Sequence, residues 1–263
     1  MRFNSPPALR QNARVSNAFY APGEQRAAKV NDLFGAIARR YDLLNDLQSF
    51  GMHRLWKRRV VRLAAAQTGK RALDLCCGTG DIAFALARSG AETTGLDFSD
   101  KMLAVANARR RRAEAGIGQA EPSAVPNPQF IQGDAQCIPF PDATFDAVTV
   151  GYGLRNLASW ERGLDEMVRV ARPGGRLAVL DFGKPPNILW RKVYFTHLKI
   201  SVPLVGWLFC GNARAYAYIL ESLRHYPAQF AVAGKMRALG LADVRIINLL
   251  GGAMAINYGR KPV

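Results

Sequence analysis

The stretch ALDLCCGTGDIAFALARSG, Ala72 to Gly90, joins a short apolar run to a Gly-x-Gly turn and then to apolar residues at helical spacing. A strand that ends in a glycine turn and leads into a helix is typical of the βαβ units of ligand-binding α/β proteins. Gly78, Gly80 and Ala83 satisfy the fingerprint G-x-G-x-x-G/A, but this motif alone is weakly specific. The adjacent cysteines Cys76 and Cys77 also raise the question of a metal site.

The same alternation continues along the chain, with helices predicted from Asp81, from Asp100 and over Trp160 to Val170. Short apolar runs that end in Gly or Asp separate these helices, which predicts an α/β fold with a parallel sheet covered on both faces. These runs are RALDLCC, ETTGLDF, PQFIQGDA, FDAVTVGYG and GRLAVLDF. The last two runs, ADVRIINLL and AMAINYGRK, are separated only by a short Gly-Gly break, which predicts an antiparallel hairpin at the edge of the sheet.

Composition sets further bounds on the protein. The 36 Lys and Arg against 20 Asp and Glu give a formal charge of +16, which attracts RNA, DNA, acidic lipids or anionic substrates alike. Four cysteines without a C-x-x-C pair favour a reduced compartment, and we read the two vicinal ones as small buried hydrophobes. The three histidines, at 53, 197 and 225, show no ligand spacing, so we predict no metal site. No apolar segment follows the first basic residue, which disfavours a secretory signal and leaves a transit peptide formally open.

Residues 1–28 lack apolar periodicity and are rich in Pro, Asn, Ala and Arg, which predicts a mobile tail. We expect a single domain over residues 29–263. Helices over residues 29–68, broken around Ser49 to Gly51, should precede the sheet.

The residues that follow each strand indicate the ligand, because ligands of such sheets lie outside the carboxyl ends of the strands. Asp81 places a carboxylate in the first turn of a helix, where it would repel a pyrophosphate. S-adenosylmethionine has an ammonium that Asp74 or Asp81 would favour, and nicotinamide-binding sheets usually lack an antiparallel end. Asp97 would accept hydrogen bonds from the ribose hydroxyls, and Asp134 and Ala135 would hold the adenine, although each acid could be a simple turn former. The predicted cofactor-binding residues are Asp74, Gly78, Thr79, Gly80, Asp97, Phe98, Asp134, Ala135 and Gly151.

Five strings, LFGAIARRYDLLNDLQSFGMHRLWKR, DLCCGTGD, LDFSDKML, GDAQCIPFPDATFDAVTVGYGLRN and EMVRVARPGGRLAVLDFGKP, closely resemble the menaquinone/ubiquinone biosynthesis C-methyltransferase family. The match covers roughly Val30 to Pro185, with a looser continuation to Lys261. The resemblance implies a class I, Rossmann-like methyltransferase with a seven-stranded sheet. It also implies methyl transfer from S-adenosylmethionine to a ring carbon of a polyprenylated quinol, with cofactor contacts at Thr79, Asp97, Asp134, Ala135 and Gly151.

Carbon methylation requires that the ring carbon be positioned in line with the sulfonium methyl group, and that a proton be removed to make the quinol ring nucleophilic. The site must therefore stabilise the oxyanion that forms. Arg155 and Asn156 in GYGLRN could hydrogen-bond the quinol oxygens, and Tyr41 and His53 on the lid helices are the other polar candidates. Tyr41 could instead be a buried ring and His53 a helix cap. CCGTGD favours demethylmenaquinol over a ubiquinone-pathway benzoquinol, whereas AINYG at the last strand departs from many family members and leaves the ring type open.

Residues 186–225 form an expected insertion. Ile188 to Cys210 is mostly apolar but carries Arg191, Lys192, Lys199 and Pro203, so it could lid an apolar channel, lie on a membrane surface or pack in the core. We therefore expect a cytoplasmic protein in peripheral contact with the inner face of the membrane. Oligomeric state stays open, with a homodimer as one candidate. The rival hypotheses are an RNA methyltransferase, against which the missing D/N-P-P-Y/F/W motif counts, and a non-catalytic adenosylmethionine-sensing or nucleic-acid-binding domain. We expect no nucleic acid partner.

Overall fold

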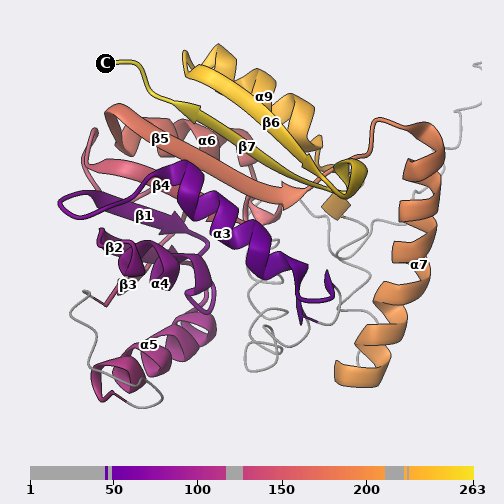
Figure 1. The fold of residues 1–263 in the computed structure, drawn as a ribbon, viewed down its shortest axis with the longest axis horizontal. Helices are drawn as coiled ribbons and strands as arrows, with labels where there is room; N and C mark the ends of the chain where they lie inside the picture. The colour runs from indigo at the N-terminus through magenta and orange to yellow at the C-terminus, as the bar shows by residue number, and fades with distance from the viewer. Residues whose placement is uncertain (1–44, 47–48, 117–126, 211–221, 224) are drawn as a thin grey trace, which may run out of the picture.

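The computed structural model describes residues 45–46, 49–116, 127–210, 222–223 and 225–263, with only the course of the helix given for 202–210. Strands and helices alternate along most of this length (Figure 1). The strands are β1 Arg71–Leu75, β2 Glu92–Asp97, β3 Gln129–Gln132, β4 Phe145–Gly151, β5 Ala171–Phe182, β6 Ala242–Leu249 and β7 Met254–Arg260. The α-helices are α3 Met52–Ala64, α4 Asp81–Arg88, α5 Asp100–Glu114, α6 Trp160–Val170, α7 Ile188–Cys210 and α9 Ala228–Ala238, and two short 3-10 helices are η2 Leu154–Asn156 and η3 Leu250–Gly252.

The strands form one seven-stranded sheet in the order β3-β2-β1-β4-β5-β7-β6. Strands β1 to β5 pair in parallel, while β7 runs antiparallel between β5 and β6. This confirms the α/β fold, the parallel sheet and the antiparallel C-terminal hairpin predicted from the sequence. The order reverses between β1 and β4, so the carboxyl ends of these two strands open a crevice for a ligand.

Each central strand sends alternate side chains to two cores, as a pleated strand must. Leu73 and Leu75 of β1 pack in the core covered by α6 and α9. Ala72 packs on the opposite face, in the core covered by α3 and α4. The same period places Asp74, the one acid inside β1, on the face of α3 and α4.

Strand β5 begins earlier than its apolar run predicts. The pairing of β4 with β5 jumps from Phe145↔Ala171 to Ala147↔Arg176, so the segment between them bulges out of the ladder. Gly174 within it has φ +77°, a conformation that suits glycine. The irregularity lies at the end of β5 away from the ligand crevice.

Helix α7 stands apart from the sheet in Figure 1. Its first turns are attached to the hairpin, because Trp190 Nε1 donates to the Leu250 carbonyl at 2.9 Å and the Tyr194 hydroxyl donates to the Ala253 carbonyl at 3.2 Å. The predicted insertion at 186–225 therefore contains a long helix, with 211–221 and 224 outside the described residues. The predicted tail 1–28, and the predicted lid helices as far as residue 44, also lie outside them. Within the described part of the chain, none of the helices is both long and apolar enough to cross a membrane.

Candidate active site

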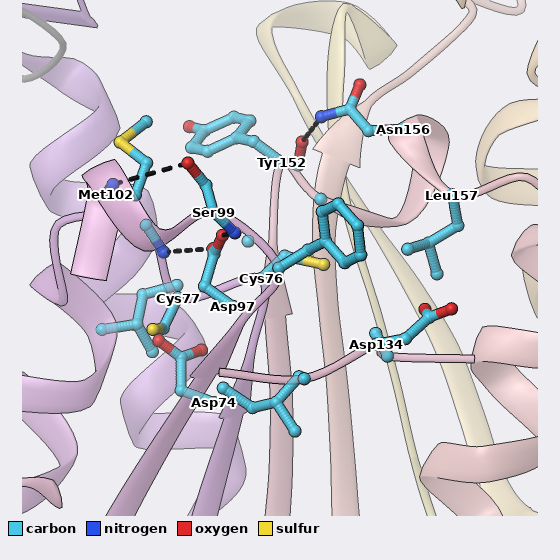
Figure 2. Close-up of a pocket in the computed structure, with 18 of the residues that line it drawn as sticks. Asp74, Cys76, Cys77, Asp97, Ser99, Met102, Asp134, Tyr152, Asn156 and Leu157 are labelled. Atoms are coloured by element: carbon cyan, nitrogen blue, oxygen red, sulfur yellow. Dashed lines mark hydrogen bonds between the residues drawn. The ribbon is translucent and has the colours of Figure 1, made fainter. Parts of the chain in front are cut away.

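A pocket lies at the carboxyl ends of β1, β2 and β4, where the strand order reverses. Its empty space amounts to about 1060 Å³, counted out to its open mouth. Figure 2 shows Asp74, Asp97 and Asp134 around it, with Tyr152 and Asn156 above them in this view. Eight of the nine predicted cofactor-binding residues line it, namely Asp74, Gly78, Thr79, Asp97, Phe98, Asp134, Ala135 and Gly151.

The ninth, Gly80, is not among the lining residues and acts through its conformation. It precedes α4 with φ +90°, and a Cβ there would meet the ring of Phe130 at 2.7 Å. Gly78 also has a positive φ of +56°, but a Cβ at this position would meet nothing within 4 Å among the described residues. Gly80 therefore allows the turn before α4, and Gly78 keeps the backbone open to the pocket.

Asp97 ends β2 and holds the glycine turn in place. Its carboxylate accepts hydrogen bonds from the backbone N–H of Gly78 at 2.7 Å and of Ser99 at 2.8 Å. Burial raises the pKa of Asp97, and the hydrogen bonds from these backbone groups oppose that rise. Ser99 in turn caps α5, accepting from the Met102 N–H. Asp97 thus has a fixed orientation and faces the pocket (Figure 2).

Asp134 and Ala135 follow β3 in a short loop. The Asp134 carboxylate accepts from the Gln136 backbone N–H at 2.8 Å and from its side-chain amide at 3.2 Å. This is the turn-forming arrangement that an Asp in a loop commonly adopts, and it leaves the carboxylate beside the pocket. Turn former and pocket wall are therefore compatible roles for Asp134.

Asp74 is the most deeply buried acid of the pocket, with 1% of its surface exposed. It pairs in register with Thr149 of β4, whose hydroxyl donates to its carboxylate at 2.8 Å. Burial raises the pKa of Asp74 to about 7, although Thr149 and the nearby Lys57 charge both lower it. Asp74 is therefore divided between its charged and neutral forms near neutral pH.

Sequence reasoning missed two cations that surround Asp81. Lys57 of α3 places its Nζ 2.7 Å from one carboxylate oxygen, and Arg109 of α5 places its Nη1 2.8 Å from the other. Burial alone would raise the pKa of Asp81, but the two cations hold it at about 2. Asp81 is thus a neutralised carboxylate, which weakens the sequence argument that it repels phosphate. Spacing along the chain gave no signal for this cluster, because its members come from three helices.

The segment GYGLRN begins at Gly151, the last residue of β4, and its Tyr152 and Asn156 line the pocket, as does Leu157, which follows it. Arg155 is not among the lining residues. Its guanidinium donates to the Tyr152 carbonyl and to Asn156 Oδ1, both at 2.9 Å, and its Nε lies 3.6 Å from Asp181. Asn156 Nδ2 also donates to the Tyr152 carbonyl at 3.1 Å. The structure therefore places Arg155 behind the turn and Asn156 in front of it.

Tyr152 was not predicted as a site residue. It has φ +62°, which is uncommon for a bulky residue and directs the chain sharply after β4. Its ring contacts that of Phe182, with 6.0 Å between centroids. A residue directly after a predicted strand end is the signal that could have identified it.

His53 lies on α3, one turn before Lys57, and is 3% exposed. Its Nε2 is 2.8 Å from Asp46, and its Nδ1 has no hydrogen-bond partner among the described residues. Burial lowers the pKa of His53, and the hydrogen bond to Asp46 only partly offsets this. The sequence also left open that His53 caps a helix. The structure shows a different arrangement, because the N-cap of α3 is Gly51 and the His53 backbone N–H donates to the Ser49 hydroxyl. Tyr41 lies outside the described residues.

The two cysteines behave differently from each other. Cys77 is buried as predicted, whereas Cys76 is only half-buried and has φ +50°. Both line the pocket, and burial raises the pKa of both thiols, which disfavours reactive thiolates. No cluster of three His, Cys, Asp or Glu side chains suited to a metal ion occurs in the described residues.

Comparisons with known proteins identify the group to which the chain is similar. The model of the ubiE/COQ5 methyltransferase family matches residues 23–261. A demethylmenaquinone methyltransferase of Desulfitobacterium hafniense is 40% identical over 91% of this chain and 92% of that protein. A ubiquinone/menaquinone biosynthesis C-methyltransferase UbiE of Azotobacter vinelandii is 40% identical over 92% of this chain and 93% of that protein.

Solved structures show the same fold. Magnesium protoporphyrin IX methyltransferase of Synechocystis, solved with bound SAH, aligns with a TM-score of 0.61, covering 89% of this chain and 99% of that one at 20% identity. A methyltransferase of Thermotoga maritima gives a TM-score of 0.59 at 18% identity, covering 88% of this chain and 99% of that one. Identities this low establish the architecture alone.

The described pocket fits S-adenosylmethionine. Asp97 and Asp134 offer acceptors for hydroxyl and amino groups, the backbone at Gly78 is open for close approach, and Lys57 and Asp74 suit a zwitterionic end. The fold, the pocket and the match to nearly the whole chain agree with the resemblance found in the sequence. The chain belongs to the ubiE/COQ5 methyltransferase family, and its cofactor is S-adenosylmethionine.

Proposed function

We propose that this protein methylates a ring carbon of a polyprenylated quinol, with demethylmenaquinol as substrate and menaquinol as product. The observation that carries this proposal is 40% identity over 91% of the chain to a protein named demethylmenaquinone methyltransferase. The nucleic acid alternatives explain the charge but not a relationship of this extent to quinone methyltransferases. A benzoquinol is the competing substrate, because other relatives are named for both ubiquinone and menaquinone biosynthesis.

S-adenosylmethionine supplies, when bound, a methyl group activated by a positively charged sulfur. The protein then has to hold the quinol carbon in line with that group and to stabilise the quinol oxygen as it loses its proton. Asn156 lines the pocket at the end of β4, and its amide is held by Arg155 on one side and the Tyr152 carbonyl on the other. We assign Asn156 the contact with the quinol oxygen and Arg155 the positioning of that amide.

His53 is our candidate for the acceptor of the quinol proton, and because it is 3% exposed and is not among the residues that line the pocket, it would accept that proton through a bridging water. The lowered pKa of His53 favours the neutral ring, and the Asp46 carboxylate accepts a hydrogen bond from the Nε2–H of that ring. The lone pair of the neutral ring therefore lies on Nδ1. A His53→Gln variant should lose the acid limb of the pH profile of kcat, whereas Lys70→Met, an exposed surface change, should keep it. An unchanged profile in His53→Gln would assign the histidine a structural role. Tyr41, outside the described residues, stays a further candidate.

Helix α7 supports contact with an anionic membrane surface, where a polyprenylated quinol resides. Ile188, Leu189 and Ile200 are exposed, and the helix carries Arg191, Lys192 and Lys199 with no acidic residue in its sequence. Sedimentation with phosphatidylglycerol vesicles should exceed that with phosphatidylcholine vesicles, and Lys192→Glu with Lys199→Glu should abolish the difference. Equal binding to both vesicles would contradict this part of the proposal.

The central test is transfer of labelled methyl from S-adenosylmethionine to a reduced short-tailed demethylmenaquinone, run in parallel with the benzoquinol precursor of ubiquinone. Wild type should methylate the naphthoquinol. Asn156→Ala should lower kcat by about 10- to 100-fold while the Kd for the cofactor changes little. Methylation of the benzoquinol alone would overturn the substrate, and methylation of neither would overturn the quinol class.

A further inference from the structure

Lys57 is a buried cation in the wall of the cofactor pocket. Only 11% of its side chain is exposed, and it reaches the pocket from α3, while Asp74 and Asp81 reach it from β1 and α4. A buried ammonium requires a nearby anion or several acceptors, because burial removes its hydration. The contacts of Lys57 therefore indicate which charged group of a ligand this part of the pocket can bind.

Among the described residues, the hydrogen-bond acceptor of Lys57 is Asp81, and the Lys57 charge also lowers the pKa of the nearby Asp74. An ammonium has three donors, so this contact satisfies it only in part. Asp81 also forms an ion pair with Arg109 of α5. Arg109 does not line the pocket, and its guanidinium also donates to the Thr79 carbonyl at 2.8 Å. Two cations around one carboxylate leave a surplus of positive charge at this end of the pocket.

Asp74 removes that surplus only in part. Its carboxylate accepts from Thr149, and its deep burial favours the neutral form. The end of the pocket at β1 and α4 thus presents a partly satisfied ammonium beside an acid. The cofactor has one anionic group, the carboxylate of its methionine part, next to an ammonium.

We propose that Lys57 holds the carboxylate of the methionine end of S-adenosylmethionine, shared between that carboxylate and Asp81, and so selects for cofactors that carry it. Asp74, the neighbouring acid, faces the ammonium of the same end. The inference depends on the cofactor alone and is independent of which quinol is methylated.

The test is a binding measurement on the full-length protein by titration calorimetry with three ligands. S-adenosylmethionine carries both the carboxylate and the ammonium. Decarboxylated S-adenosylmethionine keeps the ammonium and the sulfonium but lacks the carboxylate, and 5′-methylthioadenosine lacks both charged groups. Wild type should bind S-adenosylmethionine about 10- to 100-fold more tightly than the decarboxylated form, the factor expected for a charged hydrogen bond.

Lys57→Met should reduce that preference to less than about threefold and should leave the Kd for 5′-methylthioadenosine unchanged. Lys57→Arg should retain most of the preference. Lys70→Met is the matched control, because Lys70 is exposed and pairs with Asp146 away from the pocket. It should behave as wild type.

Equal affinity of wild type for the first two ligands would overturn the proposal, and this comparison needs no variant to fold. An equal loss of affinity for both ligands in Lys57→Met would also overturn it, since Lys57 would then act through Asp81 and the turn. Binding of 5′-methylthioadenosine reports separately that the adenosine end of the site is intact.

Discussion

Replacing Arg155 with Met tests whether this residue acts on the substrate or behind it. Its side chain and that of Asp181 are 5% and 4% exposed, so the change leaves a buried carboxylate without its cation. It also removes two hydrogen bonds of the turn and a stacking contact, with the guanidinium 4.8 Å from the centroid of the Phe182 ring.

The expected cost follows from the burial of this pair. Breaking a buried ion pair from one side costs about 3–5 kcal/mol. Burial already raises the pKa of Asp181, and Arg155 is the charge that lowers it, so the lone carboxyl will take up a proton and limit the cost. We expect about 3 kcal/mol, equivalent to a fall in Tm of roughly 6–12 °C for a chain of this size.

Differential scanning calorimetry of the apoprotein measures this loss. The double variant Arg155→Met with Asp181→Asn should regain most of the stability, because the unpaired charge is gone while the side-chain oxygen can still accept from the backbone N–H of residue 155 or of residue 182. Methyl transfer should stay low in both variants, since Asn156 has lost its support. Arg172→Met, which removes an exposed partner of Asp146, should shift the Tm by less than about 2 °C.

An Arg155→Met variant that keeps its Tm yet loses methyl transfer by more than about 100-fold would refute this reasoning. The guanidinium would then act directly on the quinol, as the sequence suggested. Recovery of both stability and activity in the double variant would refute the positioning role.

Three further changes test other parts of the site. Asp97→Asn should weaken cofactor binding by about 10- to 100-fold in calorimetry, because the neutral amide is a poorer acceptor for hydroxyls and for the Gly78 N–H; an unchanged Kd would remove Asp97 from the site. The pKa of Asp74 is raised to about 7, so the folded state binds more protons than the unfolded chain between about pH 4 and 7 and loses stability as pH rises through that window. Asp74→Asn should remove this contribution, worth at most about 4 kcal/mol, in denaturant titrations of the apoprotein; because the lowered pKa of His53 gives the opposite slope in the same window, the variant is compared with wild type, and an unchanged slope would contradict the assignment. Gly153→Ala should destabilise the protein by about 2 kcal/mol or more, because its Cβ would collide with the Cβ of Cys76, and adding Cys76→Gly should restore stability; a tolerated single change would show that the turn can shift.

The fold could be predicted from the sequence because its signals are local. A strand such as Arg71–Leu75 followed by Gly78-Thr79-Gly80 and a helix from Asp81 reveals a βαβ unit without any knowledge of distant residues. The Gly-Gly break likewise predicted the antiparallel pair of β6 and β7. Eight of the nine residues predicted to bind the cofactor line one pocket for the same reason, since parallel topology brings the residues after each strand to one edge.

What the sequence could not determine is which side chains neutralise one another. The partners Lys57 and Asp81 lie 24 positions apart, and Arg155 and Asp181 lie 26 apart, on elements whose packing no local pattern fixes. Charge and type alone made Arg155 a catalytic candidate, whereas its burial against Asp181 and its bonds to Asn156 place it behind the pocket wall. The local pattern determined the sheet and the edge at which the pocket lies, and only tertiary packing decided which charges line that pocket, because burial and pairing depend on all the elements that surround a side chain.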